Sequence, residues 1–248
     1  MPRFFIRKDQ IIDTDGTKTV HITGDDAHHI SRSLRMAAGE KIEVSDMQRM
    51  LYECELVEFL EKEVVARVLS ERCSDVEPVC EITLYQALPK GDKMETVIQK
   101  SIECGAFKII PFKSERSIVK IDKKDEEKKR ARWQKIAEGA AKQSGRAIIP
   151  EIGPIMSFEE AIENACKSSL VLLCYEAEDK VSIKDALRNV KIEKTISVII
   201  GSEGGFSEKE AQLAISKGAK SVTLGKRILR TETASSFVLA CIAYETEL

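Results

Sequence analysis

The stretch Val198-Ile199-Ile200-Gly201-Ser202-Glu203-Gly204-Gly205-Phe206-Ser207-Glu208-Lys209-Glu210 joins an apolar run to a glycine loop and then to a helix start. Ser207 and Glu210 have the spacing of a capping box, which marks the first turn of a helix. A buried strand that enters a helix through glycines is the arrangement that aims backbone N–H groups at an anion. A carboxylate in the middle of such a loop, that of Glu203, is therefore unexpected.

The loop at 201–205 fits neither of the common phosphate-binding motifs, G-x-x-x-x-G-K-[ST] and G-x-G-x-x-G. Glu203 would repel a pyrophosphate, since like charges a few ångströms apart in a partly desolvated loop cost on the order of several kcal/mol. Glycines still permit close backbone approach, which suits a nucleoside. S-adenosylmethionine meets that description, because it has an adenosine, a sulfonium cation and no phosphate. For this loop taken alone, a tight turn with one exposed glutamate remains the alternative.

Strand-like and helix-like segments alternate from residue 80 to the end of the chain. Apolar runs of strand length lie at 82–88, 107–112, 170–175, 195–200 and 221–224, with helical segments near 92–104, 124–143, 157–166, 183–189, 207–217 and 232–246. This alternation predicts an α/β domain with a largely parallel sheet, whose ligands bind beyond the carboxyl ends of the strands. The basic segment LGKRILRTETA, residues 224–234, is the second candidate loop, with Thr231 or Thr233 as the cap of the last helix.

The first 72 residues have a different pattern. Runs at 41–45, 51–57 and 63–69 alternate or are rich in β-branched residues, and polar turns separate them. Such short strands predict a small β-barrel. Residues 73–79, CSDVEPV, are typical of a linker, so we expect two domains, 1–72 and 73–248.

Composition limits the classes of function. The chain has 248 residues, of which 43% are apolar, enough for a sizeable core. No run reaches the roughly 20 apolar residues that span a bilayer, and the charged N-terminus lacks the core of a signal peptide. We therefore expect a cytoplasmic protein with no membrane partner.

Cysteine and histidine usage predicts no metal site. The seven cysteines are scattered and never spaced as Cys-x-x-Cys, so we expect neither disulfides nor zinc but small apolar residues in or near the core. His28 and His29 have no second ligand cluster at a suitable spacing.

Charge is unevenly distributed along the chain. The net charge of −2 taken alone argues against a nucleic-acid partner. Residues 84–150, however, contain 16 Lys or Arg against nine Asp or Glu, so one region is basic. Within it, the mixed signs of residues 123–135 are more typical of a solvated helix face, with Trp133 packed against the sheet.

Several motifs together resemble one family. GSEGGFS (201–207) and LGKRILRTETA (224–234) resemble the G-P-E-G-G-[FL]-S and L-G-P-R-[IV]-L-R-T-E-T motifs of the RsmE family. These are SPOUT-class methyltransferases that methylate N3 of a uridine in small-subunit (16S) ribosomal RNA. The similarity extends over essentially the whole chain and includes HISRSLRM (29–36), LPKGDKME (88–95), QKSIECG (99–105), SERS (114–117) and QSGR (143–146).

The resemblance implies a fold and a cofactor. It implies a PUA-like β-barrel followed by an α/β domain with a trefoil knot, which general fold rules disfavour, in an obligate homodimer that binds S-adenosylmethionine among the knot loops. Ser202 and Lys226 stand where the family usually has proline, and the loss of a fixed φ puts cofactor affinity in question. The implied cofactor-binding residues are Leu173, Cys174, Tyr175, Gly201, Ser202, Glu203, Gly204, Gly205, Leu224, Gly225, Ile228, Leu229, Thr233 and Ala234.

Methyl transfer to N3 of a uracil requires in-line alignment and removal of the N3 proton. Arg230 is the candidate cation for the charge that spreads onto O2 and O4. Glu232 is a weaker candidate for the base. A role as an acidic residue in the first turn of the helix, or as the ion-pair partner of Arg230, accounts for it equally well.

The polar residues that match RNA-binding positions of the family lie mostly in or beside the basic region, and such charges give salt-sensitive affinity. They are Arg32, Arg35, Lys90, Lys93, Arg116, Gln143 and Arg146. Two other functions stay open: a non-catalytic protein that binds ribosomal RNA or the ribosome, and a phosphate-binding nucleotide enzyme on an open sheet. The intact Arg230 and Glu232 disfavour the first, and Glu203 disfavours the second.

Overall fold

The computed structural model describes residues 1–119, 121–188 and 194–248, which form two compact units. The first consists of Met1–Glu77 with Ala141–Ile149, and the second of Pro78–Ala140 with Pro150–Leu248. The expected division at residues 72 and 73 stays a prediction. The end of the helix expected at 183–189 lies outside the described residues.

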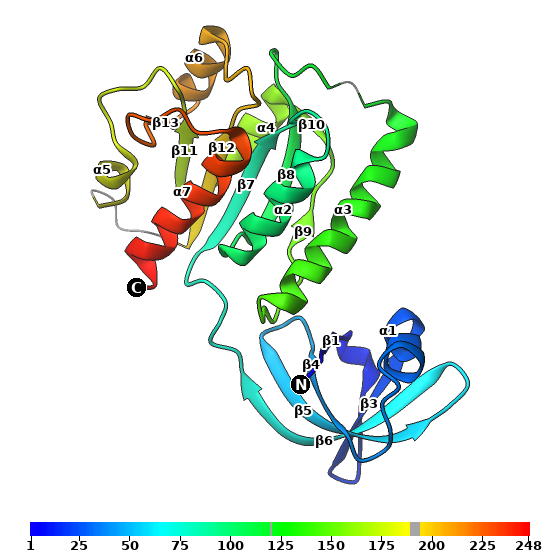
Figure 1. The fold of residues 1–248 in the computed structure, drawn as a ribbon. Helices are drawn as coiled ribbons and strands as arrows, with labels where there is room; N and C mark the ends of the chain where they lie inside the picture. Colours follow the sequence, from blue (N-terminus) through cyan, green and yellow to red (C-terminus); the bar gives the residue numbers. More distant parts are fainter. Residues whose placement is uncertain (120, 189–193) are drawn as a thin grey trace. The chain divides into compact units, whose positions relative to one another are not determined.

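The first unit is built on one six-stranded sheet (Figure 1). Neighbouring strands pair antiparallel, except for a parallel pair at one edge. The strands run in the order β1 (Arg3–Phe5), β4 (Lys41–Ser45), β5 (Met50–Phe59), β6 (Glu63–Cys73), β3 (Thr17–Thr23) and β2 (Ile11–Thr14). The three predicted runs are β4, β5 and β6. No ladder joins β1 to β2 among the described strands, so backbone pairing leaves the expected barrel open there.

Side chains that alternate along these strands form the core of the first unit. Val20 and Ile22 of β3 and Ile42 and Val44 of β4 are each at most 1% exposed. This period of two is the one that a half-buried strand requires. Three short helical segments, which the sequence did not predict, complete the unit: η1 (Lys8–Gln10), α1 (Gly24–His28) and η2 (His29–Ser33).

A buried ion pair holds the segment 141–149 in the first unit. Arg146 Nη2 lies 2.7 Å from Glu77 Oε2, and neither side chain is more than 4% exposed. The other oxygen, Glu77 Oε1, accepts the backbone N–H groups of Ala147 and Ile148. Removal of either charged partner would leave the other as a buried charge without this ion pair, which is strongly destabilising.

The second unit contains a parallel sheet, which confirms the expected α/β domain. The strands run in the order β10 (Met156–Ser157), β8 (Lys108–Lys113), β7 (Glu81–Ala87), β12 (Thr195–Ile200), β11 (Leu170–Cys174) and β13 (Lys220–Val222), with β9 (Glu151–Ile152) beside β8. Every pair is parallel. The two-residue strands β9 and β10 were not predicted, and β13 ends two residues before the predicted run.

Helices cover both faces of this sheet, as Figure 1 shows. They are α2 (Lys93–Glu103), α3 (Lys123–Gln143), α4 (Phe158–Ala165), α5 (Ile183–Arg188), α6 (Glu208–Ser216) and α7 (Thr231–Thr246). On one face α2 packs against α7. On the other, α4 and α6 share a buried cluster with the strands, in which the rings of Phe112 and Phe206 stack. Trp133 of α3 is buried, at 5% exposure.

The capping box predicted at Ser207 and Glu210 forms at the start of α6. Ser207 Oγ accepts the backbone N–H of Glu210, and Glu210 Oε2 accepts the backbone N–H of Ser207. The start of α6 therefore follows directly from the end of the glycine loop, at the carboxyl edge of the sheet where β7, β11, β12 and β13 end.

Candidate active site

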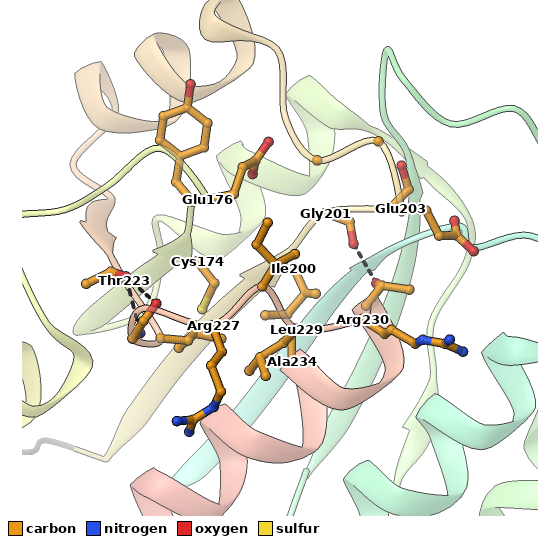
Figure 2. Close-up of a pocket in the computed structure, with 18 of the residues that line it drawn as sticks. Cys174, Glu176, Ile200, Gly201, Glu203, Thr223, Arg227, Leu229, Arg230 and Ala234 are labelled. Carbon is orange, nitrogen blue, oxygen red and sulfur yellow. Dashed lines mark hydrogen bonds between the residues drawn. The ribbon is translucent and has the colours of Figure 1, made fainter.

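A cavity of about 560 Å³ lies beyond the carboxyl ends of β11, β12 and β13 (Figure 2). The two motif loops and the segment after β11 form most of its wall. The predicted cofactor-binding residues line it except for Leu173, which is fully buried, and Thr233, which is exposed on α7. The lining residues that the cofactor prediction did not include are Lys93, Glu176, Ile200, Val222, Thr223, Lys226, Arg227, Arg230 and Thr231. Lys226, Arg227, Arg230 and Thr231 lie within the second motif, and Ile200, Val222 and Thr223 lie just before the two motifs.

A buried polar network fixes the two loops to each other. Thr231 Oγ1 donates a hydrogen bond to the carbonyl of Gly201 at 2.6 Å, drawn in Figure 2, and accepts one from Gln86 Nε2 at 2.9 Å. Ser235 Oγ lies 2.6 Å from Gln86 Oε1. All three side chains are at most 5% exposed. The network joins the end of β7 and the start of α7 to the glycine loop, and the sequence motifs gave no sign of the role of Gln86.

Gly205 is required by a close approach of Glu176. Gly205 has φ +63°, and a Cβ atom there would lie 1.8 Å from Glu176 Oε1. The same carboxylate oxygen accepts the backbone N–H of Phe206 at 3.2 Å, while the N–H of Gly205 bonds the carbonyl of Ser202. No residue with a side chain fits this turn while Glu176 keeps its place.

Glu203 is held at the start of α2. Lys93 Nζ lies 2.7 Å from Glu203 Oε1, and the backbone N–H of Lys90 lies 3.2 and 3.3 Å from the two carboxylate oxygens. Burial acts to raise the pKa of Glu203, but the bonds from Lys93 and Lys90 outweigh it and the pKa is lowered. The same hydrogen bond raises the pKa of Lys93. The carboxylate is therefore charged but already paired, so the repulsion of phosphate argued from the sequence is weaker than expected.

The loop of the SERS motif also contacts the glycine loop. Arg116 Nη1 donates to the carbonyl of Gly204 at 3.1 Å and lies 3.9 Å from Glu176 Oε1. Glu115 accepts a hydrogen bond from Ser207 Oγ at 2.6 Å, and its backbone N–H bonds Glu210. Residues 114–117 thus support both the glycine loop and the start of α6.

The second loop, 224–230, is much less constrained. Among the described residues, its hydrogen bonds are those between Thr223 Oγ1 and the backbone of Gly225, and those that the carbonyl of Arg230 accepts from the backbone N–H groups of Thr233 and Ala234 at the start of α7. Ile228 is 98% exposed. Arg227 and Arg230 make no ion pair or side-chain hydrogen bond to any described residue, and Figure 2 shows their side chains pointing away from one another.

Glu232 has an incompletely satisfied carboxylate. It lies in the first turn of α7, and its Oε2 atom is buried without a hydrogen-bond partner among the described residues. The nearest cation is Lys93, with Nζ 4.0 Å from Oε2. The expected ion pair with Arg230 does not form in the part of the chain that the structure describes, which leaves the first-turn and base interpretations of Glu232.

The residues predicted to bind RNA fall into two groups. Five are exposed: Arg32, Arg35, Lys90, Arg116 and Gln143. The other two are engaged elsewhere, because Arg146 lies in the buried ion pair with Glu77 and Lys93 lines the cavity. The burial of Arg146 therefore argues against a contact between this side chain and RNA.

The thiol in the cavity wall is unreactive in character. Burial raises the pKa of Cys174 to about 12, so this side chain is a neutral, apolar part of the wall. All seven cysteines are free, and Cys73 is the exposed one.

Among the described residues, no three His, Cys, Asp or Glu side chains gather as metal ligands do, and no helix is both long and apolar enough to cross a bilayer.

Comparisons with known proteins agree with one another. Residues 76–243 match the family model of an RNA methyltransferase domain, and residues 22–69 that of an RNA methyltransferase PUA domain. Ribosomal RNA small subunit methyltransferase E of Bacillus subtilis is 35% identical, over all of this chain and 98% of its own. The Neisseria gonorrhoeae protein of that name, solved with S-adenosylmethionine, is 32% identical with a TM-score of 0.83, over 98% of this chain and 97% of its own. A putative methyltransferase of Legionella pneumophila, also solved with S-adenosylmethionine, is 31% identical with the same TM-score, over 98% and 96%.

Proposed function

Because this chain belongs to the ribosomal RNA small subunit methyltransferase E family, we propose that it transfers a methyl group from S-adenosylmethionine to N3 of a uridine in 16S ribosomal RNA. The observation that carries the proposal is the cavity at the carboxyl ends of β11 and β12, because the family's two motif loops form its wall. The alternative of an open-sheet nucleotide enzyme requires a phosphate cradle that the loop does not provide.

The residues of the cavity fit S-adenosylmethionine. A volume of about 560 Å³ lies within the usual range of small-molecule sites. Ser202 is 8% exposed, and its Oγ atom is buried without a partner among the described residues, which leaves a hydroxyl for a polar ligand. A Cβ at Gly201 would lie 3.3 Å from the backbone of Gly205 and from the ring of Phe206, so a side chain at this position would crowd the hairpin. When bound, the cofactor supplies an electrophilic methyl group on a sulfonium.

The two catalytic candidates lie where the second loop meets α7. Arg230 lines the cavity and has no partner among the described residues, so its guanidinium is available for the charge that develops on O2 and O4 of uracil. Glu232, in the first turn, has the buried and unpartnered oxygen that a proton acceptor for N3–H needs. An orphaned carboxylate oxygen costs stability, which a ligand that donates a hydrogen bond would recover.

Five of the exposed polar residues are proposed RNA contacts. They are Arg32, Arg35, Lys90, Arg116 and Gln143, all exposed. Arg116 also bonds the carbonyl of Gly204, so contact with RNA there would act directly on the cofactor loop. A cytoplasmic location follows from a substrate made and assembled in the cytoplasm.

A trefoil knot and a homodimer complete the proposal. The chain leaves β13 at one edge of the sheet, yet the start of α7 bonds Gln86 at the end of β7, so it passes the ends of β11 and β12. That crossing supports a SPOUT-type knot.

The face of α7 opposite its buried stripe carries Phe237, Ala240 and Tyr244, the last 66% exposed, and a second copy of the chain would cover it. Light scattering of the wild type and of Tyr244→Glu tests the dimer.

A methylation assay tests the proposed function. Small ribosomal subunits and free 16S ribosomal RNA, both from a strain without this gene, are incubated with the protein and labelled S-adenosylmethionine, and the nucleosides are analysed. N3-methyluridine is the expected product. Cofactor binding without product on either substrate would favour the non-catalytic alternative. Calorimetry that detects ATP but not S-adenosylhomocysteine would favour the phosphate-binding enzyme.

A further inference from the structure

We propose that Lys93 is a positioning residue of the cavity and not part of the RNA-binding surface, an inference that rests on the proposed function. Its ammonium group stands between the carboxylates of two walls that lie far apart in the sequence. One carboxylate belongs to Glu203 of the glycine loop, and the other belongs to Glu232 of α7. By its hydrogen bond to Glu203 and its position 4.0 Å from Glu232, Lys93 fixes the glycine loop and places a cation beside the candidate base.

The geometry distinguishes Lys93 from a surface lysine. It is the first residue of α2, and its Nζ atom lies 2.7 Å from Glu203 Oε1 and 4.0 Å from Glu232 Oε2. Its side chain is 36% exposed, and it lines the cavity together with the glycine loop. A lysine whose ammonium is engaged by a carboxylate at hydrogen-bond distance is poorly placed to neutralise a phosphate, since contact with RNA would require it to leave its partner.

The charges around Lys93 explain why the cation is needed there. Glu203 and Glu232 attract it, and Arg230 acts in the opposite sense on its pKa. The hydrogen bond that Lys93 donates to Glu203 is the largest influence, and the pKa of Lys93 is raised, so the ammonium stays charged. Without the ammonium, Glu203 would lose its ion pair and would keep the backbone N–H of Lys90, and Glu232 would lose its nearest cation. The glycine loop would then lose the side-chain contact that joins it to α2.

Lys90 provides an internal comparison. It is exposed, and it contacts Glu203 through its backbone N–H alone, which any substitution other than proline preserves. Lys93→Met and Lys90→Met thus remove the same charge three residues apart, but only the first removes a side-chain contact with the cavity. Lys180→Met is the control for loss of an exposed lysine elsewhere.

The experiment measures cofactor binding and RNA binding separately. Calorimetry with S-adenosylhomocysteine is expected to show about fivefold to tenfold weaker binding for Lys93→Met, rescue to within about twofold by Lys93→Arg, and no change for Lys90→Met or Lys180→Met. Binding to small subunits across a salt series is expected to show an unchanged slope for Lys93→Met and a shallower slope for Lys90→Met.

A double-substitution cycle ties the effect to the contact. If Lys93 acts through Glu203, then Glu203→Gln and Lys93→Met together weaken cofactor binding no more than the larger single effect. Thermal unfolding of each variant separates loss of fold from loss of contact. The inference is overturned if Lys93→Met binds S-adenosylhomocysteine as the wild type does, or if its salt slope falls as that of Lys90→Met does. Failure of the wild type to bind S-adenosylhomocysteine would instead overturn the proposed function.

Discussion

The two loops that wall the cavity differ in how firmly the protein holds them. The glycine loop is fixed at Glu203 by Lys93, at Gly204 by Arg116 and at Phe206 by Glu176. In the part of the chain that the structure describes, no side chain from a distant segment holds the loop at 224–230: its bonds are those of Thr223 to Gly225 and of the Arg230 carbonyl to the first turn of α7, and Ile228 is almost completely exposed. One wall is therefore formed before any ligand arrives, whereas the other has side chains whose interactions are still available to a ligand, to RNA or to a second protomer.

The largest effect is expected in the loop at 224–230, which is the less constrained of the two. Arg230→Ala should lower methylation by about a hundredfold or more, because it removes the cation that stabilises charge developing only in the transition state. Binding of S-adenosylhomocysteine should be nearly unchanged. The measurement is turnover on small subunits with calorimetry in parallel, and Lys180→Ala is the control for loss of an exposed cation.

Turnover of Arg230→Ala within threefold of the wild type would remove Arg230 from the mechanism. It would also weaken the view that the unconstrained loop is reserved for catalysis.

The alternation of strands and helices and the position of the two loops could be predicted from the sequence, because each rests on local signals. Apolar runs, the Ser207 capping box and glycines at the turn of the loop are readable within a few residues of one another. The predicted strands β7, β8, β11 and β12 appear within a residue or two of their expected bounds.

What the sequence did not reveal depends on contacts between distant segments. Glu203 looked like a repulsive charge because Lys93 is 110 residues away in sequence. Arg146 matched an RNA-binding position, but its pairing with Glu77 buries it. Gln86 lies in an apolar run and gave no sign of the hydrogen bonds that join it to Thr231 and Ser235. A hydrophobic period or a sequence motif describes a single segment of the chain, whereas each of these interactions joins two segments that are distant in sequence.

The next effect contrasts one glycine in each loop. Gly205→Ala should lower the free energy of unfolding by about 2 kcal/mol and weaken cofactor binding, because it strains a backbone with positive φ and because the exposed carboxylate of Glu176 must move away and release the N–H of Phe206. Gly225→Ala has a positive φ but nothing within 4 Å of the Cβ, so about 1 kcal/mol of backbone strain is expected. Denaturant unfolding and calorimetry of both variants provide the measurement.

Equal losses for Gly205→Ala and Gly225→Ala would show that backbone strain alone sets the cost. The glycine loop would then be no more constrained, in free energy of unfolding, than the loop at 224–230.

A smaller effect should appear in the pH dependence of stability. The pKa of Glu203 is lowered in the folded protein, so its ion pair stabilises the fold above the ordinary value of 4.5 and is lost as pH falls through the lower folded value. Glu203→Gln should therefore be less stable than the wild type by about 1 kcal/mol or less at neutral pH, and the difference should vanish in acid. Melting temperatures of both proteins between neutral and acidic pH provide the measurement, and a difference that grows on acidification would contradict the sign.

The smallest expected effect tests the single hydroxyl that restrains the free loop. Thr223→Val removes the bonds between Oγ1 and the backbone of Gly225, at 3.2 and 3.4 Å, with little change in shape. A loss of about 0.5 kcal/mol in the free energy of unfolding and about twofold weaker cofactor binding are expected, since these two bonds are long and do not join the loop to a distant segment. Thr246→Val, which removes a comparable bond to Ile242 at the end of α7, is the matched control. A tenfold loss of cofactor binding for Thr223→Val, with the control unchanged, would mean that the second loop is also held in place before the ligand binds.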